Sequence, residues 1–116
     1  MRGLTNYHDG LAAESGVERE YCERGGEIAA RRWRGKSGEI DLVVRKGSEI
    51  VFVEVKKSRD FAKAAERITA GQILRITRAG EEFLATQPMG QLTNTRVDVA
   101  LVNGQGETQI IENVTL

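Results

Sequence analysis

Two periodicities of hydrophobic residues along the chain predict a sheet flanked by helices. Apolar residues spaced three and four apart predict a helix over 10–24 and mostly helical structure over 59–86. The first helix should end at Gly25-Gly26, and the second should be broken near Gly71. Segments that alternate polar and apolar residues, or form short apolar runs, predict five strands: 27–34, 39–45, 50–57, 97–102 and 109–114. This order favours an α/β fold with a mixed β-sheet, with α+β as the alternative.

A hairpin is predicted where Gly47-Ser48 separates two of these strands. Glycine in the first position of a two-residue loop suits a type II′ turn. In that register Asp41 lies opposite Glu54, and Glu39 lies opposite Lys56. These four polar side chains then share one face, and the other face carries apolar side chains: Ile40, Leu42, Val53 and Val55.

The pair Asp41 and Glu54 suggests a site for a divalent cation. Like charges directly opposite each other destabilise a sheet, and a hard cation would compensate them. Mg²⁺ commonly binds one or two carboxylates together with water and phosphate oxygens. Lys56 lies two residues beyond Glu54, on the same face, where it can reach a phosphate. The alternative is a solvent-facing strand of mixed charge, and a register slip of one residue would separate the groups.

Two further polar residues interrupt apolar helix faces. Glu14 falls within the apolar arc of the first helix, where a carboxylate is costly unless it is paired or near a metal. Glu18 lies in the same arc, and either residue can instead lie at its margin. Gln72 falls within the apolar stripe of the second helical segment. It is either a capping or packing amide, or a polar group that points toward the site of Asp41 and Glu54.

Length and composition indicate a single domain over 1–116. The sequence contains no apolar run of roughly 18 residues, so no membrane-spanning helix is expected. One cysteine excludes an internal disulfide and a cysteine-based zinc site. No secretory signal is visible, and together these features predict a cytoplasmic protein.

The formal net charge is zero, but the charge is unevenly distributed along the chain. Residues 31–78 carry 13 basic and six acidic residues, net +7, between two acidic blocks of net −3 and −4. Such a chain can present a cationic face, unless folding averages the bias away. Basic residues flank the hairpin in sequence, among them Arg34, Lys36, Lys57 and Arg59. They are candidate contacts for nucleic-acid phosphates, which set affinity and not sequence preference.

The hairpin sequence resembles a known family. An acidic residue on the first helix, then Asp41, then Glu54-Val55-Lys56, looks like the PD-(D/E)xK nuclease superfamily, with its restriction-endonuclease-like core. More narrowly, Gly38-Glu39-Ile40-Asp41-Leu42 followed by Val51-Phe52-Val53-Glu54-Val55-Lys56 resembles the YraN family. These are small bacterial proteins, predicted to be endonucleases related to Holliday-junction resolvases.

The resemblance implies a role for each matching residue. Asp41, Glu54 and the carbonyl of Val55 would hold Mg²⁺ or Mn²⁺. Lys56 would position the attacking water or stabilise charge on the phosphate, and Glu14 would complete the acidic cluster. Relatives tend to carry a lysine where this chain has Gln72, so one phosphate contact differs.

The resulting functional hypothesis is a metal-dependent endonuclease that hydrolyses phosphodiester bonds in DNA, specifically branched or junction DNA. Resolvase-like enzymes tend to form dimers that make paired cuts, so a homodimer is one form that the resemblance implies, and the sequence leaves the oligomeric state open. The rival hypotheses are a nucleic-acid-binding module that retains the fold without cleaving and a protein-interaction module.

Overall fold

A five-stranded sheet in the order β1-β2-β3-β4-β5 forms the centre of the computed structural model, which describes residues 2–114, and their side chains from residue 12 onward. Strands β1, β2 and β3 are antiparallel neighbours, β4 is parallel to β3, and β5 is antiparallel to β4. The sheet is therefore mixed. The strands span Glu27–Gly35 (β1), Gly38–Lys46 (β2), Glu49–Lys57 (β3), Thr95–Val102 (β4) and Thr108–Ile111 (β5).

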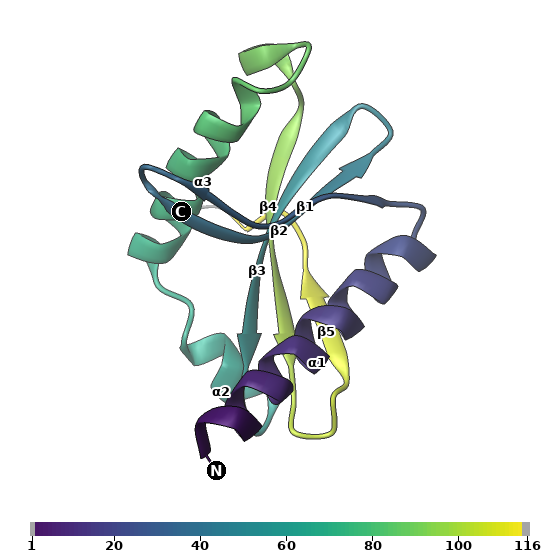
Figure 1. Ribbon diagram of the computed structural model, residues 1–116, viewed down its shortest axis with the longest axis vertical. Coiled ribbons are helices and arrows are strands. Elements are labelled where there is room, and N and C mark those ends of the chain that lie inside the picture. Colours follow the sequence, from purple (N-terminus) through teal and green to yellow (C-terminus); the bar gives the residue numbers. More distant parts are fainter. Residues whose placement is uncertain (1, 115–116) are drawn as a thin grey trace.

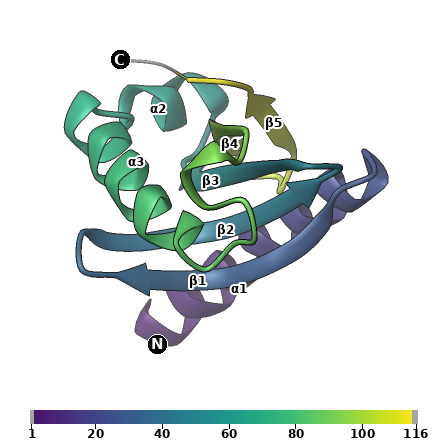
Figure 2. The same cartoon turned by 90° about the horizontal axis from the view of Figure 1, so that it is seen from above.

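Helices cover both faces of this sheet. Helix α1 lies on one face, and α2 and α3 lie on the other (Figures 1 and 2). The helices span Arg2–Glu23 (α1), Phe61–Glu66 (α2) and Ala70–Leu84 (α3), and a short 3₁₀ turn (η1) spans Gly90–Leu92. The predicted α/β class with a mixed sheet flanked by helices is confirmed, and the arrangement is consistent with a restriction-endonuclease-like fold. Within the described residues, no helix is long and apolar enough to span a membrane.

The long helical segment divides at a different point from the one predicted. The break falls at residues 67–69, before Gly71, because Thr69 starts a new helix. The Thr69 hydroxyl accepts a hydrogen bond from the Gln72 backbone N–H, and the Gln72 side chain accepts one from the Thr69 N–H, each at 3.1 Å. This reciprocal capping box satisfies two backbone donors at the helix start. Helix α1 begins earlier than predicted, and β5 ends at Ile111, earlier than predicted.

The central strand β3 is buried on both faces. Val51 and Val53 pack in the cluster that includes Val17 and Tyr21 of α1. Phe52, on the opposite face, packs in the cluster that includes α3 residues. This alternation explains why β3 reads as an almost continuous apolar segment.

The β2–β3 hairpin adopts the predicted register over its first five pairs, from Lys46↔Glu49 to Leu42↔Val53. Gly47 has a φ of 62°, the left-handed conformation that a tight hairpin turn requires and that glycine adopts readily. The pairing between β2 and β3 ends at Leu42, although both strands continue. Asp41 and Glu54 therefore lie just beyond the last pair.

Beyond that point β2 turns over, and one predicted face is wrong. Ile40 packs in the cluster with α3, whereas Leu42 packs in the cluster with α1. Strand β1 makes the same change opposite this region: Arg31 bonds to Glu18 of α1, while Trp33 packs with α3. Arg32 lies between them with a φ of 48°, a left-handed conformation that interrupts regular alternation. The face change coincides with this local distortion, which the hydrophobic pattern does not encode.

Candidate active site

Asp41 lies at the fork where β2 stops pairing with β3. Its Oδ2 accepts a hydrogen bond of 2.8 Å from the backbone N–H of Val55 on β3. A side chain thus takes the place that a backbone carbonyl would occupy in a continuing ladder. The contact fixes the Asp41 carboxylate between the two strands, beside Glu54.

Glu54 is a buried acid, with 7% of its surface exposed. The pKa of Glu54 is raised to about 8, most strongly by burial and then by a hydrogen bond to Asp41 and the charge of Asp41. Lys56 and Arg75 act in the opposite direction by electrostatic attraction. Asp41 and Glu54 therefore lie together, in an environment where a proton or a cation is needed to keep both carboxyl groups in place.

Arg75 is a further member of this group that the sequence analysis missed. It projects from α3, and its Nη2 lies 3.3 Å from Oε2 of Glu54. Arg75 comes three residues after Gln72, one turn further along the same helix, so a helical projection centred on Gln72 is the signal that would have found it. Gln72 itself uses its side chain in the α3 capping box.

Lys56 and Val55 continue β3 beyond Glu54, and both are half-buried. Lys56 is close enough to lower the pKa of Glu54. Val55 donates its N–H to Asp41. The three residues of the Glu54-Val55-Lys56 motif therefore all lie at the fork.

Glu14 is not gathered into the same group. It lies on α1 and forms an ion pair of 3.1 Å with Arg32. Across the residues that the structure describes, no three or more His, Cys, Asp or Glu side chains lie close enough to hold a metal together. The acidic pair at the fork is Asp41 and Glu54.

Two carboxylates with oxygen donors fit the chemistry of Mg²⁺ or Mn²⁺. Mg²⁺ is commonly held by one or two carboxylates, with water and substrate phosphate oxygens completing its coordination. Burial and the neighbouring Asp41 disfavour the ionised form of Glu54, and Lys56 and Arg75 favour it. A bound cation would favour the ionised form, as an adjacent positive charge does.

The predicted phosphate contacts lie at the ends of the strands. Arg34 is exposed near the end of β1 and pairs with Glu39 at 2.9 Å. Lys36 is exposed in the β1–β2 turn. Lys57 ends β3, and Arg59 is exposed two residues later.

The β1–β2 turn is held against α3 by a residue that the sequence did not reveal. Glu82 accepts hydrogen bonds from the backbone N–H groups of Lys36 (2.7 Å) and Ser37 (2.9 Å). These bonds lower the pKa of Glu82. Trp33, from the same hairpin, packs edge-on against Phe83 with ring centroids 5.5 Å apart, which supports a packing role for this tryptophan.

Comparison with known proteins gives the chain a family. The model of the uncharacterised protein family UPF0102 matches residues 13–102, which include the whole fork. This chain belongs to the UPF0102 family. A UPF0102 protein of Ruegeria pomeroyi is 56% identical over 112 residues, covering 97% of this chain and 91% of the relative. A UPF0102 protein of Cereibacter sphaeroides strain KD131 is 54% identical, covering 97% of each chain. A UPF0102 protein of Dinoroseobacter shibae is 42% identical, covering 99% of this chain and 86% of the relative.

Proposed function

We propose that this UPF0102 protein is a divalent-metal-dependent endonuclease that hydrolyses phosphodiester bonds in DNA in the cytoplasm. The observation that carries the proposal is the fork itself. Asp41 and the buried Glu54 are held together there, with Lys56 and Arg75 close enough to influence the charge of Glu54. Paired carboxylates beside cationic side chains suit a reaction in which negative charge increases on a phosphate.

The chain's own residues have distinct roles in this proposal. Asp41 and Glu54 would hold Mg²⁺ or Mn²⁺, with the Val55 carbonyl as a further ligand that the resemblance implies. A cation bound there would supply a Lewis acid for the phosphate and the attacking water. The Lys56 ammonium donates hydrogen bonds, to the water or to a phosphate oxygen, and so orients the attack.

Branched or junction DNA is the proposed substrate, with a homodimer as the proposed form that makes paired cuts. The exposed basic residues at the strand ends would contact backbone phosphates around the site: Arg34, Lys36 and Arg59, together with the half-buried Lys57 and Gln72. Contacts of this kind set salt dependence and not sequence preference. Recognition by DNA shape is therefore expected.

One observation favours a second candidate, a DNA-binding module that does not cleave. Glu14 pairs with Arg32, so the fork contains two carboxylates without the third that the resemblance implies. In that case DNA affinity should survive Asp41→Asn and Glu54→Gln unchanged or become tighter, because each variant removes negative charge near the phosphates.

The test is a nicking assay on supercoiled plasmid and on a labelled four-way junction, with Mg²⁺ or Mn²⁺. We expect cleavage by the wild-type protein and a loss of about a hundredfold or more in Asp41→Asn and in Lys56→Ala. Glu81→Gln, which alters an exposed acid on α3, is the matched control and should cleave normally. If the wild-type protein gives no cleavage above Asp41→Asn on any of these substrates, the enzymatic proposal fails.

A further inference from the structure

Arg75 occupies a position that a metal ion would compete for. Its guanidinium lies 3.3 Å from a carboxylate oxygen of Glu54, whose side chain is 9% exposed, while the Arg75 side chain is 45% exposed. One guanidinium nitrogen therefore meets the buried acid, and nearly half of the Arg75 side chain is exposed to solvent. Arginine carries five N–H donors, so several remain for another ligand.

A glycine at the start of β2 leaves room for the Arg75 side chain. A Cβ atom at Gly38 would lie 2.8 Å from Cδ of Arg75, closer than real contacts, and 3.1 Å from Cγ, tighter than most of them. Gly38 also has a φ of 143°, which side chains rarely adopt. The arginine stem thus lies directly against the backbone at position 38, three residues before Asp41.

Arg75 cannot leave Glu54 by losing its proton, because guanidinium groups stay charged in proteins. A cation that binds Glu54 must therefore repel or displace it. Once displaced from Glu54, the guanidinium lies beside the fork, and the N–H groups that faced Glu54 are available to another acceptor. A phosphate oxygen pair is the partner that its planar geometry fits best.

We propose that Arg75 is an exchangeable counter-charge, which holds Glu54 in the metal-free protein and turns to a phosphate of the DNA backbone when a divalent cation binds. This inference rests on the proposed function and adds a mechanism for coupling its two ligands. Metal binding releases Arg75 for DNA, and DNA stabilises the released form, so each ligand increases the affinity for the other.

The test measures metal and DNA affinity separately, without relying on cleavage. Mg²⁺ binding is measured by calorimetry without DNA. Binding of a fluorescent four-way junction is measured by anisotropy in EDTA and in Ca²⁺. The variants are Arg75→Gln, the charge-conserving Arg75→Lys, and Arg78→Gln, which removes an exposed arginine from the next part of the same helix.

For Arg75→Gln we expect the two affinities to change in opposite directions. Mg²⁺ should bind about threefold more tightly, because the competing charge is gone. In Ca²⁺ the junction should bind about tenfold more weakly, because a charge-assisted contact to phosphate is lost. In EDTA the loss of junction affinity should be smaller. Arg75→Lys should keep wild-type Mg²⁺ affinity and recover part of the DNA affinity. Arg78→Gln should leave Mg²⁺ affinity unchanged.

A purely structural ion pair would give a different result. Arg75→Gln would then weaken or preserve Mg²⁺ binding, with equal effects on DNA binding in EDTA and Ca²⁺, and either result overturns the proposal. If the wild-type protein binds neither Mg²⁺ nor the junction, the proposed function fails together with this inference. If the wild-type protein binds both and Arg75→Gln matches Arg78→Gln in both affinities, the role of Arg75 alone fails.

Discussion

At the scale of single residues, Glu54 links the stability of the protein to pH. Its pKa is about 8 in the folded protein, mainly because of burial, and its ordinary value is 4.5. Between these values the folded state holds a proton that the unfolded state releases. The free energy of unfolding should therefore fall as pH rises from about 4.5 to about 8, and change no further above that range through this group.

The variant Glu54→Gln removes this contribution. As the pH rises from 5 to 8, the free energy of unfolding of Glu54→Gln should therefore increase by about 2–4 kcal/mol relative to that of the wild-type protein. Urea denaturation in EDTA at the two pH values measures the difference. Glu39→Gln, on β2 and paired with Arg34, is the control and should show no such trend. A difference between wild type and Glu54→Gln that is equal at both pH values would contradict the raised pKa.

At the scale of elements, sequence predicts what is local and misses what comes from elsewhere in the chain. The pairing of β2 with β3 is set by a two-residue turn, so it could be predicted, and the proximity of Asp41 to Glu54 followed. Arg75 lies 21 residues from Glu54, and its contact depends on how α3 packs, which no pattern specifies. The face change at Ile40 lies opposite a left-handed residue, Arg32, in another strand, and no local pattern around Ile40 indicates it.

Helix α3 also orders the β1–β2 turn, through Glu82. Because two backbone N–H groups stabilise its ionised form, its pKa is lowered, and this contribution is lost as pH falls through the folded pKa. In Glu82→Gln we expect faster hydrogen exchange at the amides of Lys36 and Ser37, with little change at β3 amides. Nuclear magnetic resonance detects both. Glu81→Gln, on the same helix, is the control, and equal exchange rates in the two variants would argue against the clamp.

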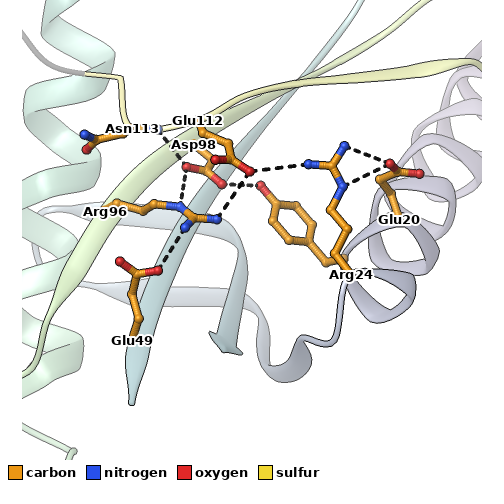
Figure 3. Close-up of polar contacts among 8 residues, drawn as sticks. Glu20, Arg24, Glu49, Arg96, Asp98, Glu112 and Asn113 are labelled. Atoms are coloured by element: carbon orange, nitrogen blue, oxygen red, sulfur yellow. Dashed lines mark hydrogen bonds and ion pairs between the residues drawn. The ribbon is translucent and has the colours of Figure 1, made fainter. Parts of the chain in front are cut away.

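At the scale of the whole molecule, a buried polar network joins the first helix to the last described residues (Figure 3). Asp98 on β4 is fully buried and accepts hydrogen bonds from Tyr21 (2.7 Å), Arg96 (3.0 Å) and the backbone N–H of Asn113 (2.9 Å). Arg96 also bonds to Glu49 at the start of β3, at 2.9 Å. The apolar run over 97–102 predicted a covered strand but not this carboxylate's partners, since Tyr21 is 77 residues away.

Because the network connects distant segments, weakening it should lower global stability. Burial and the bond to Asp98 raise the pKa of Tyr21 well above its usual range, so the hydroxyl stays a donor at all ordinary pH values. Tyr21→Phe removes one of three donors to a buried carboxylate and should cost about 1–2 kcal/mol in free energy of unfolding. Arg24→Gln, which breaks exposed ion pairs to Glu20 and Glu112 in the same region, should cost less than about 1 kcal/mol.

Urea denaturation at pH 7 compares the two variants. Equal losses would mean that the Tyr21–Asp98 bond is no more important than a surface ion pair. A larger loss in Tyr21→Phe, with faster exchange at the Asn113 amide, would identify Asp98 as the residue that joins α1, β4 and the segment after β5.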